Sequence, residues 1–152
     1  MTLDVRGRSG GLAMGWDTCV VKALNIWGFE SVLGMTVQGL DLGVPVDVFN
    51  LYGPYINRPL FWDKIFSLDL FGGDMVVIGG DLNFSLGQAE VWGPFSCPDP
   101  LSDYFTQKLI EKNWLDIEPV KLKPTWHNNR CGDGRVAKIF GRFLVNEKMV
   151  DQ

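Results

Sequence analysis

The stretch Gly79-Gly80-Asp81-Leu82-Asn83-Phe84 decides the fold of this chain. It follows Asp74–Ile78 (Asp-Met-Val-Val-Ile), which is fully apolar after its first residue, as is typical of a central strand covered on both faces. Two glycines at the end of such a strand allow backbone geometry that a side chain would forbid. Asp81 is therefore expected at the carboxyl edge of a sheet, where open α/β sheets commonly bind ligands.

Asp81 and Asn83 supply a carboxylate and a neutral amide two residues apart. Such a pair suits a site that orients a water molecule and holds a phosphate oxygen. An Asp and an Asn after a strand also form Asx turns that have no role in catalysis. The glycines do not make a phosphate loop, because no Gly-Lys-Ser/Thr follows and no G-x-G-x-x-G opens a helix. Taken alone, the pair leaves both interpretations open.

Working outward from this motif, the pattern predicts strands and helices in alternation. Strands are expected at residues 9–16, 31–42, 44–52, 114–117 and 140–145, a helix from Asn57 to the glycines at 72–73, and a second helix after Pro100. In the strand 44–52, Asn50 and Tyr52 share a face with Val46 and Val48. This interleaving favours an α/β or α+β fold with helices packed on sheets.

Composition narrows the class of protein. The chain has 152 residues, of which 46% are hydrophobic and 21% charged, so it fits one globular domain and excludes a disordered chain. No apolar run reaches the roughly 18 residues needed to span a membrane. The three cysteines form no C-x-x-C pair, which argues against structural zinc or a disulfide framework. An intracellular protein with reduced thiols is expected.

Charge is distributed unevenly along the chain. The formal net charge is −4, which gives no overall attraction to nucleic acid. Residues 1–120 carry seven basic and 15 acidic side chains, whereas residues 121–152 carry seven basic and three acidic ones. A basic C-terminal stretch beside an acidic body could place a phosphate backbone at their border, although ordinary solvated surface charge explains the pattern equally well.

Several further motifs lie before and after the central one along the chain. In chain order they are Asn50–Pro54 (Asn-Leu-Tyr-Gly-Pro), Gly79–Phe84, Pro124–Trp126 (Pro-Thr-Trp) and Asn128–Arg130 (Asn-Asn-Arg), with Ser9–Ala13, Glu90–Gly93 and Arg142–Val145 as further matches. In order and spacing they resemble the endonuclease/exonuclease/phosphatase family. The last three are most similar to the endonuclease domain of plant LINE-type retrotransposons. The resemblance extends from about Arg8 to Val145.

The resemblance implies a fold and a reaction. The family folds as a four-layer sandwich of two mixed β-sheets flanked by helices, so the chain is expected to be α/β (α+β) and to form part of such a sandwich. The family hydrolyses phosphodiesters or phosphomonoesters with a divalent metal, usually Mg²⁺. Its retrotransposon members nick DNA and leave a 3′-hydroxyl for priming.

The resemblance also assigns residues. Asp81 would activate or orient the attacking water, Asn83 would hold the scissile phosphate, and Tyr52 would donate to a phosphate oxygen. Substrate binding would fall to Asn50, Thr125, Trp126, Asn129 and Arg130, with the indole stacking on a base or sugar and the last two contacting phosphates. By residue type alone, Tyr52 can equally cap the core, and Trp126 can be a core aromatic.

The chain departs from the family pattern in ways that bear on activity. The family opens with a catalytic Asn and a metal-binding Glu, both upstream of where Met1 falls, and it closes with a Ser-Asp-His that has no counterpart before Gln152. Gly141 stands where the family has an Asp that orients the catalytic His. His127, the only histidine, is not at the catalytic position. The metal ligands therefore stay unknown, since the main family ligand for Mg²⁺ is absent.

These observations lead to one expectation and one alternative. Residues 1–152 are expected to form a single domain, incomplete at both ends, of a retrotransposon-derived, metal-dependent phosphodiesterase that is weakly active or inactive. The alternative is a non-catalytic nucleic-acid or protein-interaction module on the same scaffold. DNA is the expected partner, without a membrane, and the protein would be nuclear if it acts on DNA. Missing N-terminal strands would leave a sheet edge exposed and favour a homo-oligomer.

Overall fold

The computed structural model describes residues 1–3, 11–39, 41, 43–68 and 71–150. Its strands are β1 (Thr2–Leu3), β2 (Leu12–Ala13), β3 (Val21–Phe29), β4 (Val32–Gly39), β5 (Val46–Tyr52), β6 (Val76–Asp81), β7 (Val91–Trp92), β8 (Trp114–Asp116), β9 (Trp126–His127), β10 (Ala137–Lys138) and β11 (Gly141–Asn146). Its helices are α1 (Arg58–Ser67), α2 (Ser102–Glu111) and α3 (Glu147–Val150), with short 3₁₀ turns η2 (Gln88–Glu90) and η3 (Gly132–Gly134).

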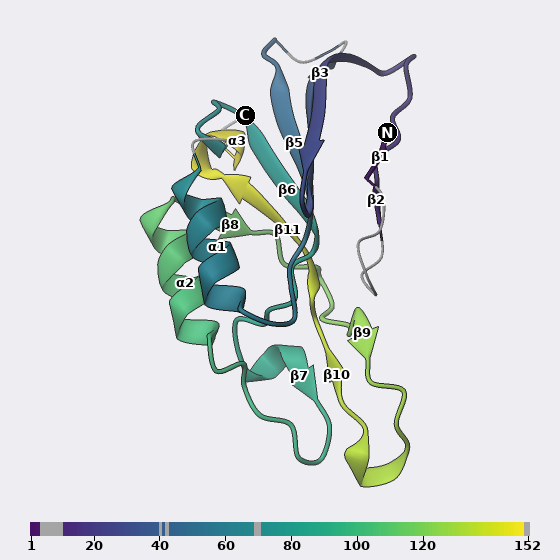
Figure 1. The fold of residues 1–152 in the computed structure, drawn as a ribbon, viewed down its shortest axis with the longest axis vertical. Coiled ribbons are helices and arrows are strands. Elements are labelled where there is room, and N and C mark those ends of the chain that lie inside the picture. Colours follow the sequence, from purple (N-terminus) through teal and green to yellow (C-terminus); the bar gives the residue numbers. More distant parts are fainter. Residues whose placement is uncertain (4–10, 40, 42, 69–70, 151–152) are drawn as a thin grey trace.

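Six strands form the main sheet, in the order β3-β4-β5-β6-β11-β8. Strands β5 and β6 are parallel, because the chain crosses over through α1 between them, and the other neighbouring pairs are antiparallel. Helices α1 and α2 cover one face of this mixed sheet, and the short ribbon of β1 and β2 lies on the other side (Figure 1). The glycine-rich motif thus ends a strand in the middle of the sheet.

Two apolar clusters occupy the two faces of the sheet. On the helical face, Trp62 of α1 is 1% exposed, and the rings of Phe84 and Phe105 stack with centroids 3.9 Å apart. On the opposite face a smaller cluster contains Val46 and Val48 of β5 together with Val77 of β6. The predicted division of β5 into two faces is confirmed, because alternate residues enter different clusters.

A second, smaller sheet lies beyond the end of the main one. It has the order β7-β10-β9, and both of its strand pairs are antiparallel. It is drawn below the main sheet in Figure 1, on the far side from α3. The predicted fold class, α+β with two sheets and flanking helices, is confirmed.

Several element boundaries differ from the prediction. The expected strand at 9–16 is reduced to Leu12–Ala13, and Ser9 and Gly10 lie outside the described residues. Helix α1 ends at Ser67 and not at Gly72, since Leu68 already has extended backbone angles. The predicted cap, Asn57, has a φ of 56° and makes no side-chain capping bond.

Strand β3 was not predicted and forms one edge of the main sheet. Its side chains include Leu24, which is 51% exposed, and Ile26, which is 36% exposed. Among the described residues, no strand pairs with the outer side of β3. A sheet edge with apolar side chains is a surface on which another strand can add, so self-association stays a prediction. Across the described ranges, no helix combines the length and the apolar character needed to traverse a lipid bilayer.

Candidate functional site

The strand register brings three predicted or family-related positions into one row. Tyr52 at the end of β5 pairs with Asp81 at the end of β6, and Asp81 in turn pairs with Gly141 at the start of β11. All three lie on the face opposite the helices, because Val48 and Val77, at even spacing from Tyr52 and Asp81, belong to the cluster on that face. The row places one carboxylate between a phenol and a residue without a side chain.

Two glycines make this strand end possible. Gly80 has a φ of 138°, and a Cβ there would lie 2.0 Å from the carbonyl oxygen of Leu51. A Cβ on Gly53 would lie 2.1 Å from the carbonyl oxygen of Leu82. The chain after β5 and the chain after β6 are therefore in backbone contact, and the N–H of Gly53 donates to the carbonyl of Asp81 at 2.7 Å.

Asp81 is half-buried and accepts a hydrogen bond from the backbone N–H of Asn83 at 3.2 Å. Burial raises the pKa of the Asp81 carboxyl above its ordinary value, and the bond from Asn83 opposes this in part. This geometry is an Asx turn, so the motif has the turn-forming role that an Asp and an Asn after a strand can take. It does not exclude chemistry, because a carboxyl with a raised pKa is a better proton acceptor.

Asn83 and Asn50 use their amide groups to hold the backbone. Asn83 is 6% exposed, has a φ of 54°, and donates from Nδ2 to the carbonyl of Gly53 at 2.6 Å. Asn50 donates from Nδ2 to the carbonyl of Ala13 in β2 at 3.1 Å. These amide groups therefore fix the strand end in this structure.

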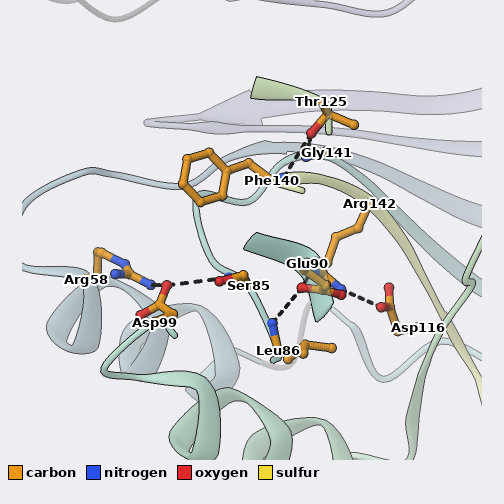
Figure 2. Close-up of polar contacts among 10 residues, drawn as sticks. All are labelled: Arg58, Ser85, Leu86, Glu90, Asp99, Asp116, Thr125, Phe140, Gly141 and Arg142. Atoms are coloured by element: carbon orange, nitrogen blue, oxygen red, sulfur yellow. Dashed lines mark hydrogen bonds and ion pairs between the residues drawn. The ribbon is translucent and has the colours of Figure 1, made fainter. Parts of the chain in front are cut away.

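Thr125 links the start of β11 to the segment before β9. Its Oγ1 accepts hydrogen bonds from the N–H groups of Phe140 and Gly141, both at 2.9 Å (Figure 2). The half-buried Trp126 packs its ring 5.4 Å from that of Phe140. Thr125 thus positions Gly141, and with it the backbone beside Asp81.

Asn129 and Arg130 lie in the segment between β9 and η3, and both are exposed. Their neighbour Asn128 organises this segment by donating to the carbonyl of Gly134 at 2.8 Å and accepting from the N–H of Arg130 at 3.2 Å. Asn129 adopts a left-handed backbone, with a φ of 55°. The segment presents the Arg130 side chain to solvent, where it is free to meet an anion.

The sequence did not reveal the buried charge cluster beneath this site. Arg142 of β11 is 6% exposed and donates from Nη2 to Glu90 Oε2 at 2.6 Å and from Nη1 to Asp116 of β8 (Figure 2). Glu90 also accepts from the N–H of Leu86 at 2.7 Å. Burial raises the pKa of Asp116, against the favourable charge of Arg142. Glu90 and Arg142 stood in separate motifs, and no sequence signal paired them.

A second buried charge pair ties α1 to the loop before α2. Arg58 at the start of α1 donates to Asp99 Oδ2 at 2.5 Å, and Asp99 is 3% exposed. The same oxygen accepts from the N–H of Ser85 at 3.4 Å (Figure 2). The chain directly after the glycine-rich motif is therefore held between two buried carboxylates, Glu90 and Asp99.

The donor groups at this strand end do not form a metal site by themselves. Within the described ranges, no three His, Cys, Asp or Glu side chains gather closely enough to hold a metal ion. In the row of Tyr52, Asp81 and Gly141, the carboxylate of Asp81 stands alone. Mg²⁺ requires near-octahedral oxygen ligands, so these residues do not by themselves fit a resident ion.

Comparison with solved structures gives the fold a context. The chain is similar to the endonuclease domain of TRAS1, a telomere-specific non-LTR retrotransposon, with a TM-score of 0.63 and 15% identity over 90% of this chain and 60% of that one. It is also similar to the mannosyl-6-phosphatase of Bacteroides thetaiotaomicron, with a TM-score of 0.50 and 12% identity over 87% of this chain and 55% of that one.

A third similar structure is TDP2 of D. rerio, complexed with a single-strand DNA product, with a TM-score of 0.50 and 12% identity over 84% of this chain and 54% of that one. No protein-family model matches the sequence, and no curated protein matches it significantly. The chain spans 54% to 60% of the length of these three structures. It has the fold of the endonuclease/exonuclease/phosphatase proteins, over somewhat more than half of their length.

Proposed function

We propose that this chain is a retrotransposon-derived, DNA-endonuclease-like phosphodiesterase domain whose own residues support weak hydrolysis. The observation that carries the proposal is the row of Tyr52, Asp81 and Gly141 at the carboxyl end of the central strands. It combines a half-buried carboxyl, whose pKa is raised, with a phenol on the adjacent strand. The likeness to the TRAS1 endonuclease domain supports this choice within the fold.

In this proposal Asp81 accepts a proton from the attacking water, and the Tyr52 hydroxyl donates to a phosphate oxygen. Thr125 acts by holding the backbone of Gly141 beside Asp81, and not by touching the substrate, since its Oγ1 already accepts two N–H groups. Arg130, exposed beyond β9, contacts the DNA backbone. The donor groups of the described residues do not fit a resident Mg²⁺, so Asp81 and Tyr52 carry the proposed step.

The test is nicking of supercoiled plasmid DNA, with and without Mg²⁺, by the chain and by its Asp81→Ala variant. Slow nicking that disappears in the variant supports the proposal. Removing one member of a catalytic unit typically costs ~10³-fold or more, so the comparison is sensitive. Nicking of equal rate in both proteins would contradict the assignment of Asp81. Hydrolysis of a phosphomonoester but not of plasmid would indicate a phosphatase instead.

A non-catalytic nucleic-acid-binding module is the second candidate, and a specific observation favours it. The side-chain amide of Asn83, which would hold the phosphate, is buried and donates to the carbonyl of Gly53. Binding of DNA that weakens steeply with salt, without nicking either in the presence or in the absence of Mg²⁺, identifies this alternative. A protein that neither binds nor nicks DNA would exclude both candidates.

A further inference from the structure

The small sheet places two aromatic rings on either side of an alanine. Ala137 on the central strand β10 pairs with Trp92 of β7 on one side and with His127 of β9 on the other. Figure 1 shows β10 between its two neighbours. Residues directly opposite each other in antiparallel strands project from the same face. The indole and the imidazole therefore project from one face, with Ala137, which is 7% exposed, between them.

The spacing of this arrangement suits a planar guest. Adjacent strands lie ~4.8 Å apart, so the Cα atoms of Trp92 and His127 are separated by ~10 Å. A flat ring that is in van der Waals contact with another ring on each of its faces requires ~7–8 Å between those two flanking rings. A cavity of about 240 Å³ occupies this place and is lined by Trp92, Gly93, Pro124, His127, Arg135 and Ala137. We call it the β10 slot.

Charge around the β10 slot favours an anionic guest. Arg135 lines it and is exposed. None of the other residues that line the slot is acidic. A guest that combines a flat ring with negative charge is a nucleotide. Stacking on aromatic faces tolerates every base, because each has a π-face.

The β10 slot is separate from the residues assigned to the proposed site. Trp126 and Lys138 are paired one position further along β9 and β10, so they project from the opposite face of the small sheet. There the Trp126 ring already contacts Phe140. Neither Trp92 nor His127 has a part in the proposed hydrolysis, and both rings are at least partly accessible.

We propose that the β10 slot binds one unpaired nucleobase of a DNA strand between Trp92 and His127, with an adjacent phosphate on Arg135. The identity of the strand as DNA rests on the proposed function, whereas the stacking geometry does not. A paired base has both of its faces covered by stacked neighbours, so the slot selects single-stranded or distorted DNA.

The experiment compares two hexanucleotides that have the same number of phosphates. One is hexathymidylate, and the other has the same sugar-phosphate backbone but lacks all six bases. Binding of each is followed by fluorescence anisotropy. The wild-type chain should bind hexathymidylate about tenfold more tightly, as expected for one stacked base. Trp92→Ala and His127→Ala should each remove most of this preference. Phe95→Ala is the matched control, because Phe95 is an exposed aromatic outside the slot, 78% exposed.

The outcomes separate this inference from the proposed function. Equal affinity of the wild type for the two hexamers, or a preference that survives in both Trp92→Ala and His127→Ala, overturns the slot. His127 is exposed, so its variant keeps the test valid even if Trp92→Ala fails to fold. If the slot variants lose the preference for hexathymidylate and no protein nicks plasmid DNA, the slot is supported and the proposed hydrolase is overturned. If the chain nicks plasmid DNA but binds both hexamers equally, the proposed hydrolase is supported and the slot is overturned.

Discussion

Gly141 lies directly opposite Asp81 in the register between β11 and β6, and space for a side chain exists there. The nearest atoms to a Cβ on Gly141 belong to Thr125 and lie 3.5 Å away, an ordinary contact. The backbone at Gly141 could therefore carry a side chain beside the carboxylate of Asp81, but glycine supplies none. This relationship bears directly on whether the row at the strand end can hold a cation.

Gly141→Asp should fold and should create a weak divalent-cation site. Two carboxylates on directly paired residues lie close enough to share one ion, whereas Asp81 alone is a poor ligand set. The measurement is paramagnetic broadening of backbone amide signals by Mn²⁺. Gly87→Asp is the control, since a Cβ on Gly87 meets nothing within 4 Å. Equal and unlocalised broadening in both variants would count against the arrangement.

Thr125→Val should destabilise the chain by ~1–3 kcal/mol. The substitution removes the oxygen that accepts from Phe140 and Gly141 and leaves two N–H groups without this partner. Thr125→Ser keeps the hydroxyl and should lose much less. Urea unfolding gives the free energies, and hydrogen exchange of the Gly141 amide reports the local effect. If the two variants were equally stable, the positioning role of Thr125 would be wrong.

Gly80→Ala should cost ~2 kcal/mol or more of unfolding free energy. A methyl group at this position lies 2.0 Å from the carbonyl oxygen of Leu51, and the φ of 138° is strained for any side chain. Gly87→Ala, which has open space and an extended backbone, should be nearly neutral. Thermal unfolding of the two variants side by side is sufficient, and similar midpoints would refute the close contact of β5 and β6.

Asp81→Asn should stabilise the chain near neutral pH. Burial raises the pKa of Asp81, so the folded state binds its proton more tightly than the unfolded state does. Between the two pKa values, stability of the wild type falls as pH rises, and above the folded-state pKa the charged carboxylate carries the full cost. The variant lacks this cost but keeps an oxygen for the N–H of Asn83.

The advantage of Asp81→Asn should therefore shrink as the pH is lowered through the folded-state pKa of Asp81 and vanish in acid. Urea midpoints of both proteins across this pH range provide the measurement. A wild type more stable than the variant at pH 7 would show that the carboxylate is favourably solvated or paired.

Arg142→Met should destabilise the chain by ~3–5 kcal/mol, because two buried carboxylates, Glu90 and Asp116, would lose the charge between them. Lys148→Met is the matched control, since its ion pair with Asp74 is on the surface and its loss should change little. Chemical denaturation distinguishes the two. A mild effect of Arg142→Met would mean that water already compensates these carboxylates.

The central strand and its glycines could be predicted from the sequence because both depend on local rules. A short apolar run followed by Gly79-Gly80 specifies a buried strand and its end, and β6 runs from Val76 to Asp81 as a result. Strand β3 escaped prediction because it lies at the sheet edge and its register shifts between Ala23 and Asn25, which interrupts the alternation of its side chains. The end of α1 was misplaced because glycines mark helix ends only in favourable contexts.

Only the positions of Tyr52 and Asp81 on neighbouring strands could be anticipated, whereas the hydrogen-bond partners of the other residues could not. Tyr52 and Asp81 are adjacent because two strands are parallel and in register, and motif order anticipated this. The partners of Asn50, Asn83 and Thr125 are backbone groups 37, 30 and 15 residues away, and no spacing rule identifies them. Buried ion pairs such as Glu90 with Arg142 arise only when distant segments meet, 52 residues apart.

The position of β11 has a consequence for how the chain acquires its structure. This strand comes after every other strand of the main sheet in the chain, yet it occupies an interior position between β6 and β8. During synthesis, the edge of β6 that pairs with β11 stays unpaired until residues 141–146 have left the ribosome. Such delayed insertion is slow and leaves an apolar strand open to aggregation, so nascent chains interrupted before Asn146 should depend on chaperones to stay dispersed.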